Sequence, residues 1–162
     1  MTGPVHIWHP FTQEALDPAP VMIERGEGAY LYTKDGRRLV DGISSWWVNL
    51  HGHGHPRIAD AIANQARLLE HVVFAGFTHE PAERLASKLR AVTPRHLTHA
   101  FFSDNGSTAV EVALKMAIQY WQNMGEPERN RVIALDHAYH GDTAGAMAVS
   151  ANSPFTEAFD RL

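Results

Sequence analysis

Residues 101–115 read Phe101-Phe102-Ser103-Asp104-Asn105-Gly106-Ser107-Thr108-Ala109-Val110-Glu111-Val112-Ala113-Leu114-Lys115, and this stretch decides the fold. It predicts a buried strand near Phe101 that breaks at a polar turn and continues as a long amphipathic helix. The apolar residues beyond the turn recur at helical spacing and define one face of that helix: Val110, Ala113, Leu114, Ala117, Ile118 and Trp121.

The turn itself, Asp104–Thr108, is a candidate phosphate site because it precedes a helix. The first N–H groups of a helix have no partners inside it, and the macrodipole is positive there. Gly106 allows close backbone approach, and Ser107 and Thr108 offer hydroxyl donors. The alternative is that Ser107 or a neighbour simply caps the helix, and the turn alone does not decide between the two.

Composition limits the classes of protein that this chain can belong to. With 162 residues, 44% of them hydrophobic, the chain is long enough for one ordinary core. Fourteen basic and 18 acidic side chains leave no basic footprint for nucleic acid or an anionic membrane surface. There is no cysteine, so disulfides and thiolate metal sites are excluded. The start lacks a signal-peptide pattern, and we expect a cytoplasmic protein.

The first 50 residues predict an amino-terminal arm and a small antiparallel meander that form part of a small domain. Residues 1–20 contain four prolines and scattered aromatic residues, without helical or strand periodicity. We expect this arm to pack on a domain surface or a partner subunit, because aromatic side chains are costly to leave in water. Short alternating runs predict three strands, with a hairpin at Asp35-Gly36: Val21–Arg25, Ala29–Tyr32 and Arg38–Asp41.

Two adjacent tryptophans, Trp46 and Trp47, follow the predicted meander. On an extended backbone their side chains would point to opposite sides. Both could fill a seam between domains, or one could form the wall of an apolar substrate pocket.

Three histidines alternate in His51-Gly52-His53-Gly54-His55-Pro56, a spacing that suggests a metal site. We reject this interpretation because no carboxylate lies nearby at a recognised ligand spacing. The glycines and the proline instead indicate a loop that leads into a helix over Pro56–Glu70. A second helix is predicted over Pro81–Val92, and the apolar segment Val72–Thr78 between the two helices is predicted to border a cavity or an interface.

A second buried strand is predicted over Arg131–Leu135, so residues 51–162 are expected to form the first part of a large α/β domain with parallel pairing. The segment Asp136–Thr143 follows this strand and contains an aromatic ring, imidazoles and a carboxylate. Ligands of open α/β sheets bind beyond the carboxyl ends of the strands. The two polar turns are therefore expected to converge on one site, which could hold a flat phosphorylated cofactor.

The combination of these motifs resembles the class III aminotransferases, which use pyridoxal 5′-phosphate (PLP) on a fold-type-I scaffold. The Gly-Ser turn and Tyr139-His140-Gly141 belong to the wider class. The arm motif and Ser44-Ser45-Trp46-Trp47 are most similar to the members that act in biotin synthesis. The matching residues run through nearly the whole chain: 6–12, 41–42, 44–47, 93–94, 104–107, 110–117, 120–121 and 139–143.

The resemblance implies a role for individual residues. Gly106 and Ser107 would bind the cofactor phosphate, with Asn105 and Thr108 beside them, and Tyr139 would stack on the pyridine ring. At least one of the two tryptophans would line the pocket for the oxononanoate chain, and Asp142 would support Tyr139 and the substrate side. Residues in the substrate set are Phe11, Trp46, Trp47 and Asp142. Phe11 stands where adenosylmethionine-dependent members carry tyrosine, which leaves the amino donor open.

The activity implied is transamination of 8-amino-7-oxononanoate to 7,8-diaminononanoate, with S-adenosylmethionine as the expected donor and a homodimer as the full-length assembly. No catalytic residue and no metal ligand is expected in this chain, since the Schiff-base lysine, the aspartate facing the pyridine nitrogen and the substrate arginine are expected beyond Leu162. We therefore expect residues 1–162 alone to be inactive. The alternatives are another class III aminotransferase, acting on an ω-amino acid or a diamine, and a non-catalytic module that binds a phosphorylated ligand.

Overall fold

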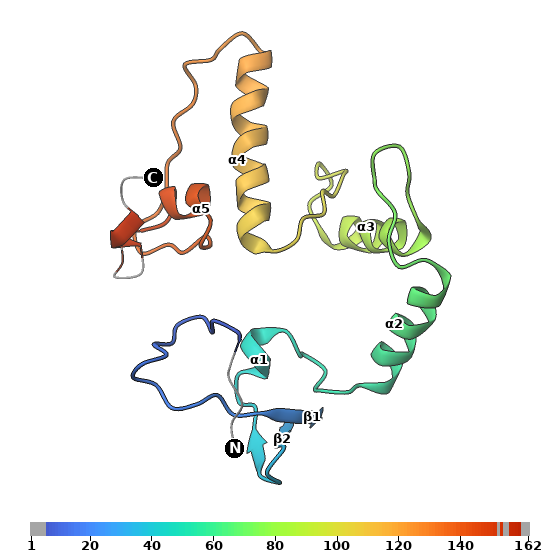
Figure 1. The fold of residues 1–162 in the computed structure, drawn as a ribbon. Coiled ribbons are helices and arrows are strands. Elements are labelled where there is room, and N and C mark those ends of the chain that lie inside the picture. Colours follow the sequence, from blue (N-terminus) through green and yellow to red (C-terminus); the bar gives the residue numbers. More distant parts are fainter. Residues whose placement is uncertain (1–5, 152, 154–155, 160–162) are drawn as a thin grey trace. The chain divides into compact units, whose positions relative to one another are not determined.

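The computed structural model describes residues 6–151, 153 and 156–159, and the chain divides into two compact units (Figure 1). The first unit runs from Met1 to Thr78 and the second from His79 to Leu162. This division describes which residues contact one another within the chain, and it does not define the domains of the full-length protein. The assignment of residues 1–50 to a small domain and of residues 51–162 to a large domain therefore stays a prediction. The part of the predicted arm formed by residues 1–5 lies outside the described residues.

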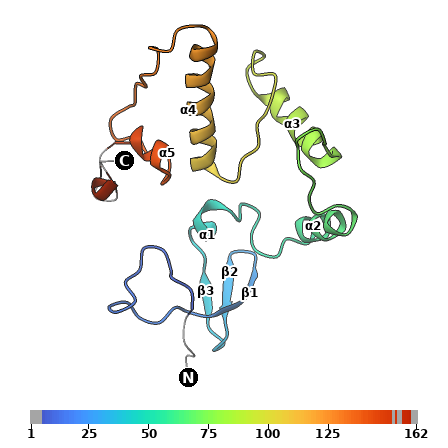
Figure 2. The same cartoon turned by 45° about the horizontal axis from the view of Figure 1, so that its top comes forward.

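The first unit contains the predicted antiparallel meander (Figure 2). Its strands are β1 (Ile23–Glu27), β2 (Tyr30–Thr33) and β3 (Arg38–Val40), paired in the order β1-β2-β3. Leu31 pairs with Leu39 across β2 and β3, and Arg25 pairs with Tyr32 across β1 and β2. The guanidinium of Arg25 lies 3.5 Å from the centroid of the Tyr32 ring, a cation–π contact that adds to the backbone ladder.

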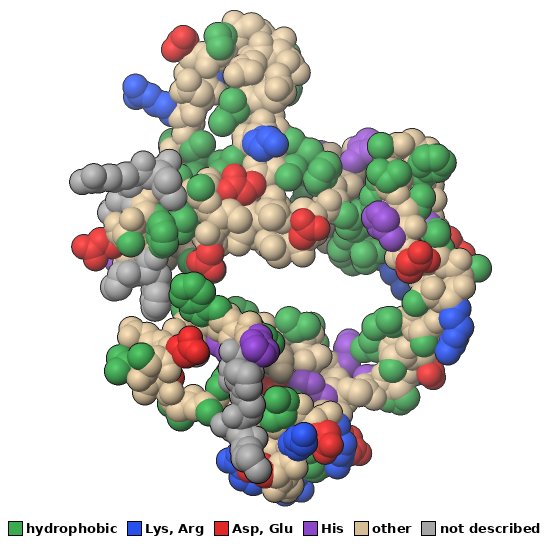
Figure 3. All heavy atoms as spheres, in the orientation of Figure 1, with side chains coloured by type: hydrophobic (Ala, Val, Ile, Leu, Met, Phe, Trp, Pro, Cys, Tyr) green, Lys and Arg blue, Asp and Glu red, His purple; other side chains and the backbone are tan. Residues whose placement is uncertain are grey.

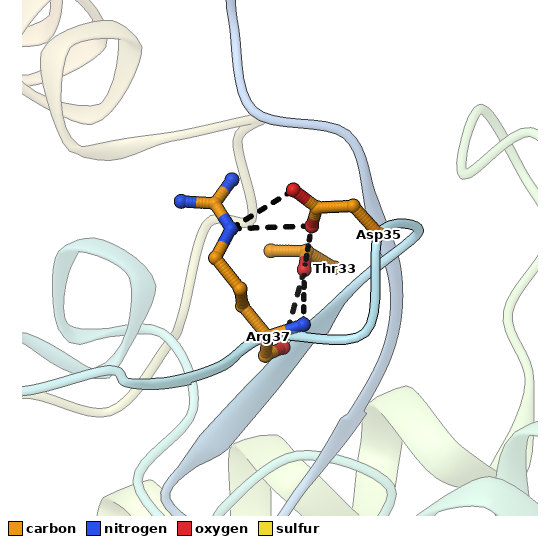
Figure 4. Close-up of polar contacts among 3 residues, drawn as sticks. All are labelled: Thr33, Asp35 and Arg37. Atoms are coloured by element: carbon orange, nitrogen blue, oxygen red, sulfur yellow. Dashed lines mark hydrogen bonds and ion pairs between the residues drawn. The ribbon is translucent and has the colours of Figure 1, made fainter.

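The hairpin between β2 and β3 is held by the hydroxyl of Thr33, whose side chain is buried although it is polar (Figure 4). This hydroxyl accepts from the backbone N–H of Arg37 at 2.9 Å and also hydrogen-bonds Asp35. The Arg37 guanidinium in turn donates to both oxygens of Asp35, at 3.2 and 3.0 Å. The Thr33 hydrogen bond lowers the pKa of the Asp35 carboxyl, and Arg37 lowers it further. The hairpin predicted at Asp35-Gly36 is thus confirmed.

We predict that Thr33→Val weakens this turn without changing the sheet, because valine keeps the shape of threonine and removes the hydroxyl. The Arg37 amide then loses its acceptor, and its hydrogen-exchange rate should rise about 2- to 12-fold, the range set by one net hydrogen bond. Thr12→Val is the matched control, since the Thr12 hydroxyl is exposed and donates to the His9 carbonyl, away from the hairpin. Equal Arg37 exchange in the two variants would contradict the role given to Thr33.

The tryptophan pair lies on a short helical turn, α1 (Ser44–Trp47), and not on an extended backbone. All four residues have positive φ angles, from 46° to 69°, so the turn is left-handed. Trp46 and Trp47 were expected to point to opposite sides only if the backbone were extended. Because the backbone is a left-handed turn, that expectation does not apply. After the loop His51–His55 the predicted helix forms as α2 (Pro56–Leu68), with proline in its first turn.

The second unit contains the other helices. These are α3 (Glu80–Val92), α4 (Gly106–Asn123), α5 (Ala144–Ala148) and the 3-10 turn η1 (Glu157–Phe159). The periodicity that predicted α3 and α4 is confirmed. Helix α3 ends at the predicted Val92 and begins one residue before the predicted Pro81, and α4 begins at the predicted turn. Figures 1 and 2 both show α5 beside the first turns of α4.

The two predicted buried strands near Phe101 and over Arg131–Leu135 are wrong as strands in this structure. Neither segment is assigned to a strand, and both are exposed: Phe101 at 66% and Ile133 at 96%. A strand requires hydrogen bonds to a neighbouring strand. Within the described residues, strand pairing is confined to β1–β3 and a bridge between Gly28 and His53. The apolar composition of these segments predicted burial, but it could not supply the partner.

Apolar side chains lie on the surface of both units (Figure 3). Among the described residues, Ala146 is the one hydrophobic residue classed as buried. The stripes that predicted the helices remain partly open, with Ile62 on α2 at 65% and Leu85 on α3 at 48% exposure. Across the described part of the chain, no helix combines the length and the apolar character needed to cross a bilayer.

Candidate functional site

The start of α4 is capped by a reciprocal pair, Asn105 and Thr108. The Asn105 Oδ1 accepts from the Thr108 N–H at 2.9 Å, and the Asn105 N–H donates to the Thr108 Oγ1 at 3.1 Å. The helix is therefore capped by neighbours of Ser107, as the alternative interpretation of the turn allowed. The capping leaves the N–H groups of Gly106 and Ser107 without an assigned acceptor in the described part of the chain. A Cβ placed on Gly106 would meet no atom within 4 Å, so its backbone is open to close approach.

The second polar turn packs directly on Ser107. The Asp142 N–H donates to the Ser107 Oγ at 3.2 Å, although the two residues are 35 positions apart. Gly141 makes this approach possible: its φ is +130°, and a Cβ there would lie 2.8 Å from the Ser107 Cα. The convergence of the two polar turns, expected from the sequence, is confirmed by this contact.

Tyr139 lies on the same turn and is hydrogen-bonded to Asp142. The phenolic hydroxyl donates to the Asp142 Oδ2 at 2.9 Å, and this hydrogen bond raises the pKa of Tyr139. The ring is 69% exposed, so its faces are accessible. Gly106, Ser107, Tyr139 and Asp142 are thus brought together within the second unit, while their binding roles stay predictions.

Glu111 holds the turn and α5 in place, a role that the sequence did not reveal. Its Oε1 accepts from the N–H groups of Gly145 at 2.6 Å and Ala146 at 3.3 Å, which are at the start of α5. The pKa of the Glu111 carboxyl is lowered, first by the hydroxyl of Thr143 and then by the Gly145 N–H. The Thr143 hydroxyl is buried and makes no hydrogen bond of standard geometry, so the Gly145 bond is the firm contact. A lone carboxylate in the run Val110-Glu111-Val112 was the available signal.

In the first unit, Asp41 holds the left-handed turn Ser44–Trp47. Its Oδ1 accepts from the Ser45 N–H at 2.9 Å, and its Oδ2 accepts from the Ser45 hydroxyl at 2.7 Å. A left-handed residue other than glycine costs about 1–2 kcal/mol, and four of them follow one another here. These side-chain hydrogen bonds offset part of that cost, together with backbone hydrogen bonds such as the one from the Val48 N–H to the Ser44 carbonyl at 3.0 Å.

His53 is the second partner of Asp41. Its Nε2 lies 2.7 Å from the Asp41 Oδ2, and both side chains are shielded, at 15% and 6% exposure. The backbone of His53 exchanges two hydrogen bonds with Gly28, at 3.0 and 2.8 Å. The ring itself packs where Gly26 lacks a side chain, since a Cβ on Gly26 would lie 2.7 Å from the His53 Cγ. The sequence did not predict this pair. The one available signal was the spacing Gly-x-Gly, which occurs both at Gly26–Gly28 and at Gly52–Gly54.

The three alternating histidines consequently have different surroundings. His53 contacts Asp41, whereas the rings of His51 and His55 meet edge to face with centroids 6.1 Å apart. In the described part of the chain, no group of three residues has the side chains and the proximity to bind a metal ion.

Phe11 and Trp46, two of the residues expected to bind substrate, lie together in the first unit. Their ring centroids are 5.5 Å apart and their planes are tilted by 44°. Trp47 is 72% exposed. The fourth residue of the set, Asp142, belongs to the second unit, where it bonds Tyr139.

We predict that the stabilisation provided by Asp41 is lost in acid. The Ser45 N–H, the Ser45 hydroxyl and His53 lower the pKa of the Asp41 carboxyl to about 2, from 3.8. A lowered pKa stabilises the folded state above the unfolded pKa, and this contribution disappears as the pH falls through the folded value.

The measurement is the difference in free energy of unfolding between the wild type and Asp41→Asn, from urea titrations at a series of pH values. The difference should be constant above about pH 5 and should shrink between about pH 4 and pH 2. A difference that does not change over this range would show that Asp41 is not ionised in this network.

Comparison with known proteins identifies the class. Residues 11–161 match the family described as aminotransferase class-III, and the chain belongs to this family. Curated relatives named adenosylmethionine-8-amino-7-oxononanoate aminotransferase include one from Synechococcus elongatus. It is 60% identical over 157 residues, which cover 97% of this chain and 37% of that protein. Another, from Geobacter sulfurreducens, is 45% identical over 97% of this chain and 35% of its own length.

Solved structures agree with this assignment and with the predicted fold-type-I class. A crystal structure of adenosylmethionine-8-amino-7-oxononanoate aminotransferase from Methanocaldococcus jannaschii superposes with a TM-score of 0.89 at 43% identity, covering 96% of this chain and 36% of the other. An amine transaminase from an uncultivated Pseudomonas species, in its PLP-bound form, has a TM-score of 0.87 at 34% identity, covering 99% and 37%. This chain thus spans about a third of the length of the curated relatives that it matches.

Proposed function

We propose that the full-length protein to which this chain belongs is a PLP-dependent aminotransferase that converts 8-amino-7-oxononanoate to 7,8-diaminononanoate in biotin synthesis. The name carried by the 60%-identical relative supports this substrate. The observation that carries the proposal is the contact between Asp142 and Ser107, which joins the Tyr139 turn to the start of α4.

The residues at this contact fit PLP. The phosphate would accept from the N–H groups of Gly106 and Ser107, at the positive end of an 18-residue helix. The Ser107 oxygen already accepts from Asp142, so its own proton remains to be donated to the phosphate. The exposed Tyr139 ring would stack on the pyridine ring, with its orientation fixed by Asp142.

PLP, when bound, supplies the carbonyl that takes up the amino group and the electron sink that stabilises a carbanion. The residues described here bind and orient it; the lysine that holds it covalently is proposed to lie outside residues 1–162. The lysines of this chain fit that role poorly: Lys34 lies in the β2–β3 hairpin, Lys88 on α3 and Lys115 inside α4. We further propose a homodimeric, cytoplasmic enzyme acting on small molecules.

The pair Phe11 and Trp46 is proposed to contact the aliphatic chain of the substrate. Two aromatic rings with centroids 5.5 Å apart offer continuous apolar area to a long-chain acid. Trp47 is proposed as a further part of this pocket. S-adenosylmethionine is the proposed donor, and Phe11 has no hydroxyl with which to form a hydrogen bond to it.

A second candidate is a class III aminotransferase for another amine. The observation that favours it is the likeness to an (S)-enantioselective omega-transaminase from Thermomicrobium roseum, with a TM-score of 0.85 at 31% identity, covering 95% of this chain and 35% of that one. The lower identity makes this candidate weaker than the oxononanoate enzyme.

The two candidates are separated by an amino-transfer assay on the full-length protein loaded with PLP. We expect 8-amino-7-oxononanoate to be converted to 7,8-diaminononanoate, detected by mass spectrometry, with S-adenosylmethionine as donor. Replacing Trp46 by alanine should raise the KM for 8-amino-7-oxononanoate, because apolar contact is lost, while cofactor content stays the same. Amino transfer to simple ketones or aldehydes without conversion of 8-amino-7-oxononanoate would favour the second candidate.

We predict that Ser107→Ala weakens the retention of PLP in the full-length protein. The substitution removes one charge-assisted hydrogen bond, so the dissociation constant for PLP should rise about 10- to 150-fold. Ser103→Ala is the matched control, because Ser103 directly precedes the same turn and its hydroxyl donates to the Asn105 carbonyl, whereas the Asp142 N–H donates to Ser107. Equal PLP affinity in Ser107→Ala and Ser103→Ala would remove Ser107 from the phosphate site.

A further inference from the structure

We propose that Asp41 and His53 are positioning residues for substrate recognition: together they lock the left-handed turn Ser44–Trp47 and so fix the Trp46 ring beside Phe11. This inference rests on the proposed function, because it treats the Phe11–Trp46 pair as a wall of the substrate pocket. Neither Asp41 nor His53 is argued to touch the substrate.

First, the left-handed backbone of the turn Ser44–Trp47 is unfavourable unless contacts outside it stabilise it. Ser45 and Trp46 have φ angles of 46° and 64°, a region that residues with a side chain avoid. Such a backbone persists only where other contacts determine it. Backbone hydrogen bonds close the turn, among them the one from the Trp47 N–H to the Ile43 carbonyl at 2.9 Å. The side-chain contacts come from Asp41, which binds both the N–H and the hydroxyl of Ser45, the residue directly before Trp46.

The second step is the anchor behind Asp41. The Asp41 Oδ2 accepts a hydrogen bond from the Ser45 hydroxyl and also lies 2.7 Å from the His53 Nε2. His53 is fixed independently of this bond, because its backbone pairs with Gly28 and its ring fills the space over Gly26. The backbone of the meander therefore fixes His53 through Gly28, and the His53 ring fixes the Asp41 carboxylate. The carboxylate in turn fixes Ser45 in the left-handed turn.

The third step connects the turn to the pocket. The side chain of Trp46 leaves the backbone in a direction set by the left-handed turn, and in that direction it meets Phe11 at 5.5 Å between ring centroids. A right-handed or extended backbone at Ser45–Trp46 would send the indole elsewhere. The geometry of the Phe11–Trp46 pair thus depends on Asp41 and His53, which support the turn that carries Trp46.

The chain offers two independent ways to break this support and a matched control. Asp41→Asn keeps the size of the side chain and removes the charged acceptor. Gly26→Ala leaves Asp41 and His53 unchanged but places a Cβ 2.7 Å from the His53 Cγ, which displaces the ring. Gly42→Ala introduces the same methyl group next to Asp41, where it would meet no atom within 4 Å.

The test uses the full-length enzyme with PLP and two readouts. In kinetics, Asp41→Asn and Gly26→Ala should raise the KM for the amino acceptor that the wild type uses by about 2- to 12-fold, the range of one aromatic contact, with kcat and PLP content unchanged. Gly42→Ala should match the wild type. The double variant should show less than the product of the two single effects, because both substitutions break the same support.

The second readout reports on the turn without any substrate. In protein labelled with 5-fluorotryptophan, the ¹⁹F resonance of Trp46, assigned through Trp46→Phe, should move in Asp41→Asn and Gly26→Ala and stay in place in Gly42→Ala. An unmoved resonance, or a moved resonance with an unchanged KM, would overturn the proposal. If the wild type does not convert 8-amino-7-oxononanoate but uses another acceptor, the proposed function fails, while these comparisons with that acceptor still decide the role of Asp41 and His53.

Discussion

The N–H groups at the start of a helix have to find acceptors outside it, and this requirement organises the second unit. In α4 the capping pair Asn105 and Thr108 meets part of the requirement and leaves Gly106 and Ser107 to bind something else. In α5 the acceptor is Glu111, which reaches across from α4. Because one helix caps the other, the turn that carries Tyr139 is held against the start of α4, where a phosphate is proposed to bind.

The first unit meets a different requirement with the same kind of group. Four successive residues with positive φ are unfavourable, and the Asp41 carboxylate compensates by accepting two hydrogen bonds from Ser45. In both units, then, a single acidic side chain supports an aromatic residue. Asp41 does this for Trp46, and Asp142 fixes the Tyr139 ring directly. Carboxylates are suited to this work because they accept several hydrogen bonds at once.

Local patterns in the sequence predicted local structure well. The Asp35-Gly36 turn and the apolar periodicity of α2, α3 and α4 were sufficient to place the meander and the helices. The predicted strands near Phe101 and over Arg131–Leu135 failed because pairing depends on partners that lie far away in the sequence. Of the candidate site, the motifs identified Gly106, Ser107, Tyr139 and Asp142, and the structure shows that these residues meet. Their binding roles stay predictions.

The supports behind the site could not be predicted for a physical reason. A positive φ at serine or tryptophan has no sequence signal, since residues with side chains rarely adopt it and none prefers it. The bond between Asp41 and His53 spans 12 positions and depends on a missing side chain at Gly26. Glu111 meets its partners 34 and 35 positions away. Each of these features is a property of the folded chain and not of any short segment.

Gly141 carries the strictest of these conditions. A Cβ at this position would meet the Cα of Ser107, which belongs to a helix and has little freedom to move aside. In addition, residues with a side chain rarely adopt a φ of +130°, so any substitution there is strained. Every single-base change of a glycine codon that alters the amino acid introduces a Cβ. In genetic terms, position 141 therefore has no conservative missense neighbour, and variation in this turn has to arise at its other residues while the backbone path between Tyr139 and Asp142 stays constant.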